Sequence, residues 1–191
     1  IEMLAAEDLA DRIKATSIAQ PLLFALQAAA ADTLRERGLE PSVVVGHSVG
    51  EVAAAYAAGH YDRERAVRLI LARSASQEFS RGTGKMAVLH VSAEDAQRFL
   101  DGLGAKAIEI AAINSPTSVT LVGPADPLAD MLKAAESAGL AGQILDIEYP
   151  FHSRIMDDAR AQLHAELADL TASPGKTLFI STVDATPLDA A

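Results

Sequence analysis

The chain has 191 residues, of which half are apolar, while aromatic residues make up only 4% and cysteine and tryptophan are absent. Its 26 acidic residues outnumber 16 basic ones, and the resulting net charge of −10 argues against a nucleic-acid-binding groove. Without cysteine there is no disulfide framework, so we expect a reducing compartment such as the cytoplasm. No apolar run is long enough for a membrane span, and residues 1–4 do not resemble a signal peptide.

The N-terminal part predicts two helices. A short helical turn is expected over residues 7–14. A longer helix follows, capped by Thr16 or Ser17 and stopped by Gly38. Its buried side is predicted from the helical spacing of Leu22, Leu23, Leu26, Ala29, Ala30 and Leu34.

A buried strand over 42–46 then runs into Gly46-His47-Ser48-Val49-Gly50, and an alanine-rich helix continues to Ala58. This order of strand, tight turn and helix is the context of a nucleophile elbow. Glycine at 46 and at 50 is expected to remove Cβ atoms that would clash in so sharp a turn. Ser48 would project from the strand end, with the Val49 amide placed to meet an oxyanion. The alternative is an ordinary strand-to-helix turn.

Another helix is expected over residues 62–79, with Ala66, Leu69, Ile70 and Ala72 on its apolar side. Arg73 lies among these apolar residues, where an arginine needs an anionic partner. That partner could be a ligand carboxylate. An internal ion pair or a side chain reaching out to solvent would explain Arg73 equally well.

In residues 85–148 the predicted strands and helices follow the order β-α-β-β-α-β, which predicts a ferredoxin-like subdomain. We expect it to be inserted into an α/β body formed by 1–84 and 149–191, whose last elements are a helix over 155–170 and a strand over 177–181. Inside the subdomain the predicted strands are 86–91, 107–113, 118–122 and 143–148, and the predicted helices are 92–100, capped by Ser92 with Asp95, and 125–138.

A serine nucleophile needs a positioned base, and the chain has five histidines. His152 is favoured because Pro150 constrains the approach to it and the segment crosses from the subdomain back to the body. His47 adjoins Ser48 in sequence, but neighbours across such a turn usually point apart. The others have structural or solvated interpretations: His60 in a surface turn, His90 in a strand and His164 on a polar helix face.

Several motifs carry a family resemblance. Gly46-His47-Ser48-Val49-Gly50-Glu51 resembles the GHSxGE signature of malonyl-CoA:acyl-carrier-protein transacylases and of the acyltransferase domains of type I polyketide and fatty acid synthases. The segment 18–27 is similar to the family's QPALFALQ helix, and 112–116 resembles its AxNSP turn, which contains Asn114. The segment 149–153 resembles the HAFHS element, whose second histidine falls on His152.

The resemblance implies an α/β-hydrolase-like body with a parallel sheet and an inserted ferredoxin-like subdomain. It implies acyl transfer through Ser48, with His152 as base and Arg73 on the free carboxylate of a malonyl-type substrate. His47, Val49, Phe151 and Asn114 would line the substrate site. No bound cofactor or metal is expected; acyl-CoA is the implied substrate. The implied acceptor is the phosphopantetheine of an acyl carrier protein, with neighbouring synthase domains as further partners.

The sequence departs from the family pattern in three places. The upstream GxGxQ motif and the family's C-terminal portion are absent, so we expect this chain to be part of a larger acyltransferase domain. Tyr149-Pro150 replaces the His-Ala of malonyl-type domains and also differs from the YASH of methylmalonyl-type domains. Phe151 agrees with the malonyl type, because its bulky ring restricts room for an α-methyl branch.

Two alternatives to acyl transfer differ in chemistry. In a serine esterase or patatin-like hydrolase, water would take the acyl group, and Asp146 or Asp184 would be the nearest acidic partner. A domain without activity, retained as a docking platform, is disfavoured because Ser48, Arg73 and His152 are all present.

Overall fold

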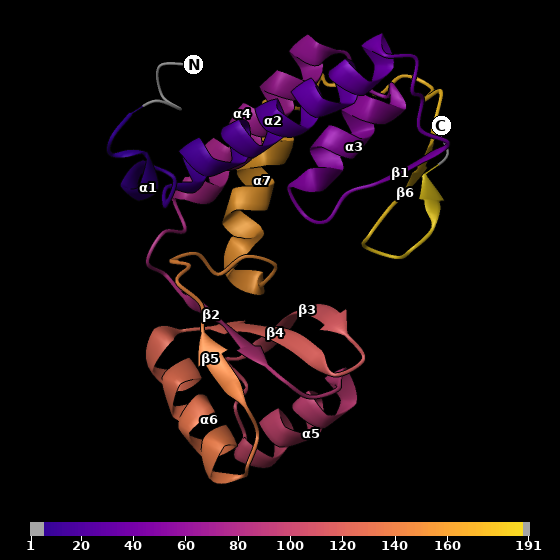
Figure 1. The fold of residues 1–191 in the computed structure, drawn as a ribbon. Helices are drawn as coiled ribbons and strands as arrows, with labels where there is room; N and C mark the ends of the chain where they lie inside the picture. Colours follow the sequence, from indigo (N-terminus) through magenta and orange to yellow (C-terminus); the bar gives the residue numbers. More distant parts are fainter. Residues whose placement is uncertain (1–5, 189–191) are drawn as a thin grey trace. The chain divides into compact units, whose positions relative to one another are not determined.

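The structure is a computed structural model that describes residues 6–188. Residues 1–5, which include the segment compared with a signal peptide, and residues 189–191 lie outside the described part. The fold is of the α/β class, as expected. It divides into two compact units (Figure 1), of which unit 1 comprises residues 1–76 and 163–191 and unit 2 comprises residues 77–162. Unit 2 thus contains the predicted subdomain 85–148 together with its two flanking segments.

Unit 1 has a small mixed sheet in the order β1-β6-β7. β1 and β6 are parallel, with Val44 opposite Phe179, and β7 is antiparallel to β6. The elements of unit 1 are α1 (Leu9–Arg12), α2 (Thr16–Glu36), β1 (Val43–Val45), α3 (Gly50–Ala58), α4 (Arg63–Glu78, which continues into unit 2), β6 (Leu178–Ile180) and β7 (Pro187–Leu188).

Two apolar clusters organise unit 1 around α3. One side of α3 packs against α2 and α4, through Val52 and Ala53 on α3, Phe24 and Ala28 on α2 and Ile70 on α4. The other side packs on the sheet through Ala54, Ala55, Ala58 and Phe179. The small alanine side chains allow this close approach on both sides, and α3 ends at Gly59, which adopts φ +86°.

The predicted buried side of α2 is wrong. Leu23, Leu26 and Leu34 are exposed, and the buried residues are Thr16, Gln20, Phe24 and Ala28, spaced four apart. This side is buried because it faces α3 and α4, and the polar members are hydrogen bonded there: Gln20 Nε2 donates to Thr16 Oγ1 at 2.5 Å. The predicted cap is also wrong, since Ala15 occupies the N-cap position without a side-chain bond.

The strand predicted to be buried over 42–46 is shorter and more exposed than expected. Val43 is 48% and Val45 is 64% exposed, whereas Val44 packs against the cluster below the sheet. Alternate side chains of a strand point to opposite faces, and α3 covers one face only. A run of three valines does not distinguish a strand buried on both faces from one buried on a single face.

Unit 2 has a four-stranded antiparallel sheet in the order β3-β4-β2-β5. The chain order β-α-β-β-α-β with this strand order is the ferredoxin-like arrangement. Its elements are β2 (Lys85–Leu89), α5 (Ala93–Leu103), β3 (Glu109–Ser115), β4 (Ser118–Gly123), α6 (Ala125–Ser137), β5 (Gly142–Ile144), a 3-10 turn (Arg154–Met156) and α7 (Asp157–Glu166, which continues into unit 1).

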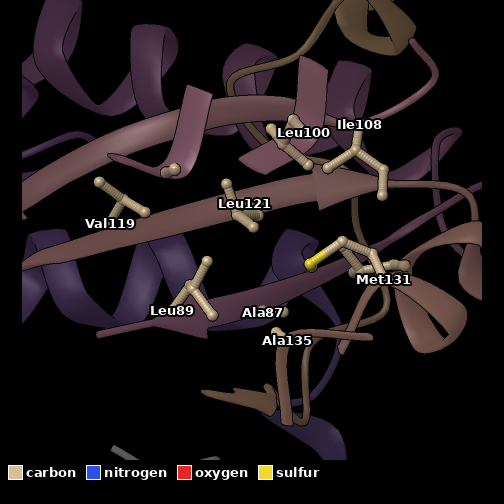
Figure 2. Close-up of a cluster of buried hydrophobic side chains, with 10 residues drawn as sticks. Ala87, Leu89, Leu100, Ile108, Val119, Leu121, Met131 and Ala135 are labelled. Carbon is tan, nitrogen blue, oxygen red and sulfur yellow. The ribbon is translucent and has the colours of Figure 1, made fainter. Parts of the chain in front are cut away.

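The core of unit 2 lies between the sheet and its two helices. Figure 2 shows Leu89, Val119 and Leu121 from the strands with Leu100 of α5 and Met131 of α6, all within one cluster of buried side chains. The cap of α5 is as predicted, because the Asp95 amide donates to Ser92 Oγ at 3.1 Å. This compact apolar layer holds the sheet and helices of unit 2 together.

Several predicted boundaries differ from the structure. The turn expected at 114–117 begins later, because Asn114 and Ser115 still belong to β3 and Ser115 pairs with Ser118 of β4. The last strand, expected over 143–148, is β5 at Gly142–Ile144. Residues 145–148 lie outside the strand, although the Leu145 amide still donates to the Met86 carbonyl oxygen at 2.9 Å. The helix expected over 155–170 begins with a 3-10 turn and ends at Glu166.

Candidate active site

Ser48 lies in the turn from Gly46 to Gly50, called here the nucleophile turn, which joins β1 to α3. Its φ of +53° places it in the left-handed region, which costs a non-glycine residue about 1–3 kcal/mol. A Cβ atom at Gly46 would lie 2.1 Å from the carbonyl oxygen of Gly50, so only glycine fits there. A Cβ atom at Gly50 would meet nothing closer than Gln27 Nε2 at 3.9 Å, and the predicted steric need for glycine at 50 is therefore wrong.

The backbone bonds of the nucleophile turn tighten it into α3. The Gly50 amide donates to the His47 carbonyl at 2.9 Å, and the Glu51 amide donates to the Ser48 carbonyl at 3.0 Å. Val49 occupies the N-cap position of α3, and its amide is not the donor of either of these two bonds. Amides at a helix N-terminus favour negative charge, which is the requirement for stabilising an oxyanion.

Glu51 joins this turn to the segment that follows β6. Its Oε1 accepts hydrogen bonds from the Thr182 amide and from Thr182 Oγ1, both at 2.8 Å. Thr182 Oγ1 also lies 3.0 Å from the carbonyl oxygen of Gly46. Because β1 and β6 are parallel neighbours, both segments leave the sheet at the same edge.

Arg73 is half-buried on α4, and its Nη1 donates a short hydrogen bond to Oε1 of Gln20 on α2. Burial lowers the pKa of the Arg73 guanidinium, and the negative charge of Glu51 opposes that shift. Gln20 in turn donates to Thr16, so a chain of polar side chains links Arg73 on α4 to α2. A planar guanidinium held in this way is suited to binding a carboxylate.

His152 belongs to unit 2 and is one of three described non-glycine residues with positive φ, at +60°. The residues before it are firmly held. Tyr149 is buried and donates from its hydroxyl to Glu78 Oε1 at 2.9 Å. Its ring stacks on Phe151 with 5.1 Å between centroids and 12° between planes. Ser153 Oγ donates to the Pro150 carbonyl at 2.7 Å, closing the turn around His152, whose side chain is exposed.

The remaining predicted site residues fall in both units. His47 is exposed in the nucleophile turn, and Asn114 lies at the end of β3, where its Nδ2 donates to Thr120 Oγ1 at 2.9 Å. Unit 1 therefore carries Ser48, Val49, His47 and Arg73, while Asn114, Phe151 and His152 belong to unit 2.

His60 was predicted in a surface turn, and the structure contradicts this. It is 7% exposed, and its Nδ1 lies 3.0 Å from the Ser173 carbonyl oxygen. The segment before β6 covers it, with Gly175 so close that a Cβ atom there would lie 2.6 Å from the ring. The helix stop at Gly59 predicts a turn but not the distant segment that packs over it.

The two aspartates considered for a hydrolase have different surroundings. Asp184 accepts hydrogen bonds from the amide and the hydroxyl of Thr186, which lower the pKa of its carboxyl group. It therefore closes the turn between β6 and β7. Asp146 is exposed in unit 2.

Three residues that contribute to the site were not singled out in the sequence: Gln20, Glu51 and Thr182. The burial of Gln20 could have been predicted from its spacing, because a glutamine four residues before Phe24 and eight before Ala28 lies on the same side of the helix as they do. Glu51 and Thr182 are separated by 131 positions, and their contact has no local signal.

Residues 6–188 contain neither a metal-binding cluster nor a membrane-spanning helix. No group of three or more histidine, aspartate or glutamate side chains there could hold a metal ion. No helix in that part of the chain has the length and apolar character needed to cross a bilayer.

Comparison with known proteins places this chain in a family. The acyl transferase domain family matches residues 2–191. A spectinabilin polyketide synthase protein of Streptomyces orinoci is 34% identical over 166 residues, which cover 87% of this chain and 5% of that protein. Erythronolide synthase EryA3 of Saccharopolyspora erythraea is 34% identical over 175 residues, which cover 91% of this chain and 6% of that protein. The chain thus spans a small part of these curated relatives.

Solved structures agree with the sequence relatives. The malonyl CoA-acyl carrier protein transacylase of Burkholderia pseudomallei matches with a TM-score of 0.87 and 29% identity, over 98% of this chain and 65% of that chain. A type II polyketide synthase acyl-carrier protein in complex with its malonyl-transacylase matches with a TM-score of 0.89 and 25% identity, over 97% of this chain and 62% of that chain. The chain belongs to the acyl transferase domain family, to which the polyketide synthase acyltransferases and malonyl-CoA:acyl-carrier-protein transacylases are related.

Proposed function

We propose that this chain is the nucleophile-bearing part of an acyltransferase that moves a carboxyacyl group, malonyl in particular, from CoA to the phosphopantetheine thiol of an acyl carrier protein. The observation that carries the proposal is Ser48, held at positive φ between β1 and α3 in a chain of the acyl transferase domain family. A strained serine at the N-terminal end of a helix is the arrangement used by acyl-transferring nucleophiles.

The reaction proceeds in two half-reactions. In the first, Ser48 Oγ attacks the thioester carbonyl while His152 takes the hydroxyl proton, and the carbon–sulfur bond breaks to release CoA, which receives that proton. In the second, the phosphopantetheine thiol gives its proton to His152 and attacks the acyl-serine carbonyl. The ester carbon–oxygen bond breaks, His152 returns the proton to Ser48 Oγ, and the acyl group leaves as a thioester of the carrier protein. The Val49 amide stabilises both tetrahedral oxyanions, and such a donor is worth roughly 3–4 kcal/mol in the transition state.

Arg73 selects the acyl group in this proposal. Its guanidinium binds the distal carboxylate of malonyl in a bidentate manner, and the hydrogen bond to Gln20 fixes the plane of the guanidinium. Leaving that carboxylate unpaired costs about 3–5 kcal/mol, so Arg73 favours malonyl over acetyl by roughly 100-fold or more.

Phe151 is proposed to exclude acyl groups that carry a branch at the α-carbon. Its ring is stacked on the buried ring of Tyr149, so it cannot easily move aside for an α-methyl group. His47 and Asn114 complete the proposed substrate-binding set, although the Asn114 amide is already engaged by Thr120.

The carrier-protein partner is supported by the kinds of protein that resemble this chain. They include polyketide synthases and a malonyl-transacylase bound to its acyl-carrier protein. Neighbouring synthase domains and a cytoplasmic location are part of the same proposal, and acyl-CoA enters as substrate with no bound cofactor.

The test is to incubate the chain with malonyl-CoA and to measure its intact mass and the release of free malonate. We expect a persistent malonyl ester that is absent in Ser48→Ala and forms far more slowly in His152→Ala. Rapid release of malonate without an adduct would favour the hydrolase alternative. An unreactive Ser48 in both the chain and a complete acyltransferase domain that contains it would contradict the proposal and favour a docking role.

A further inference from the structure

The nucleophile turn is closed by a side-chain contact from outside its own segment. Glu51, the residue after Gly50, accepts two hydrogen bonds at 2.8 Å from Thr182, one from the amide and one from the hydroxyl. The Thr182 hydroxyl is also 3.0 Å from the carbonyl oxygen of Gly46, the first residue of the turn. Thr182 thus contacts the residues on both sides of Ser48.

This contact acts where the backbone is under strain. The left-handed conformation of Ser48 persists only if the surrounding structure determines it. Within the turn, two backbone hydrogen bonds and the close approach of Gly46 to Gly50 hold the shape. The hydroxyl of Thr182 has one proton to share between Glu51 Oε1 and the Gly46 carbonyl. It therefore holds Gly46, at the beginning of the turn, close to the side chain of Glu51, just after its end.

The carboxylate of Glu51 is suited to this position for a further reason. A hydrogen bond from an amide to an ionised carboxylate is about twice as strong as one between neutral groups. The same charge acts on the guanidinium of Arg73, whose loss of solvation on burial it opposes. One side chain therefore interacts both with the segment after β6 and with the arginine that the proposed function assigns to the substrate carboxylate.

We propose that Glu51 and Thr182 are positioning residues that together hold Ser48 in its reactive conformation. In this proposal they act through the backbone of the nucleophile turn, by way of the Gly46 carbonyl and of Glu51 at the start of α3. The inference rests on the proposed role of Ser48, but the contact itself can be tested without any acyl substrate.

The experiment compares Glu51→Ala, Glu51→Gln, Thr182→Val and the double variant Glu51→Ala/Thr182→Val. Amide hydrogen exchange is measured over residues 46–52 and 181–186, and Ser48 reactivity is measured with a fluorophosphonate. Glu64→Ala, at an exposed glutamate in the first turn of α4, is the matched control.

We expect Glu51→Ala to speed exchange in both segments and to slow Ser48 labelling by about 10- to 100-fold, the range of a hydrogen bond to a charged group. Glu51→Gln retains a hydrogen-bond acceptor, so its exchange and labelling rates should lie between those of Glu51→Ala and the parent. The double variant should be no slower than the slower single variant, because both remove the same contact. Thr182→Val keeps the β-branched shape and the backbone amide of threonine and removes only the hydroxyl. It therefore tests the same contact if Glu51→Ala does not fold.

Three results would overturn the inference: unchanged exchange over 46–52 in Glu51→Ala, losses that multiply in the double variant, or an equal effect of Glu64→Ala. Failure of the proposed function looks different. In that case the parent Ser48 would react with neither malonyl-CoA nor the fluorophosphonate, while hydrogen exchange would still report whether Glu51 and Thr182 hold the turn.

Discussion

Arg73 on α4 donates a hydrogen bond from Nη1 to Oε1 of Gln20 on α2, and this bond joins two helices that pack against the helix following Ser48. Gln20 is 6% exposed, and its side-chain amide bonds to Thr16 as well as to Arg73. The position of the guanidinium in unit 1 is therefore set by α2 as well as by its own helix.

Replacing Gln20 by leucine should reduce the preference for malonyl-CoA over acetyl-CoA by about 10-fold, because the guanidinium loses the bond that fixes its plane. Acetyl loading should change little, since acetyl has no carboxylate for Arg73. The measurement is kcat/KM for both thioesters. Gln97→Leu on the exposed side of α5 is the control, and an equal loss for both substrates would show that Gln20 does not act through Arg73.

Replacing Arg73 by alanine should cost roughly 100-fold or more in malonyl loading relative to acetyl loading. The malonyl preference of Arg73→Lys should lie between those of the parent and Arg73→Ala, because lysine keeps the charge but not the bidentate geometry. Arg68→Ala is a matched control on the same helix, where the exposed side chain pairs with Asp169 at 2.6 Å. If Arg73→Ala loads malonyl as well as the parent and gains nothing on acetyl, the assignment of Arg73 is wrong.

Two glycines of the nucleophile turn should respond in opposite ways to alanine. At Gly46 the new Cβ atom would lie 2.1 Å from a backbone oxygen, so we expect a loss of stability on the order of 3 kcal/mol. At Gly50 there is room, and alanine should be neutral or stabilise the first turn of α3 by up to ~1 kcal/mol. Urea denaturation of both variants checks this, and equal destabilisation would contradict the steric account.

The local features of the fold could be predicted from sequence because each depends on neighbouring residues. The strand, turn and helix around Ser48 follow from a run of valines, the glycine at 46 and a run of alanines. The cap at Ser92 follows from Asp95 three positions later, and the order of strands and helices in unit 2 follows from alternating patterns.

Contacts between distant segments could not be predicted in this way. The buried side of α2 depends on its packing against α3 and α4, where Gln20 is buried and bonded to Arg73 while Leu26 is exposed. His60 is buried by the segment around Gly175, more than a hundred positions away. The role of His152 toward Ser48 stays a prediction, since the two belong to different units.

Acid should weaken unit 1 in part through the ion pair of Arg68 and Asp169. The hydrogen bond from Arg68 lowers the pKa of the Asp169 carboxyl below its ordinary 3.8. A depressed folded-state pKa contributes stability above the unfolded value that disappears as pH falls through the folded value. The free energy of unfolding of the parent should therefore exceed that of Asp169→Asn slightly at pH 7. This difference should disappear as the pH falls below 3.8, as measured by urea denaturation. A difference that grows in acid would contradict this.

Tyr149 should stabilise the segment that carries His152 through both its hydroxyl and its ring. Tyr149→Phe removes the 2.9 Å hydrogen bond to Glu78 but keeps the stacking on Phe151, so the free energy of unfolding should fall by about 1–3 kcal/mol. Tyr149→Ala should cost more, about 3–5 kcal/mol, and should also speed hydrogen exchange over residues 150–154. Tyr61→Phe in unit 1 is the control. Unchanged exchange in Tyr149→Ala would mean that the turn between Pro150 and Ser153 holds the His152 backbone without the aromatic stack.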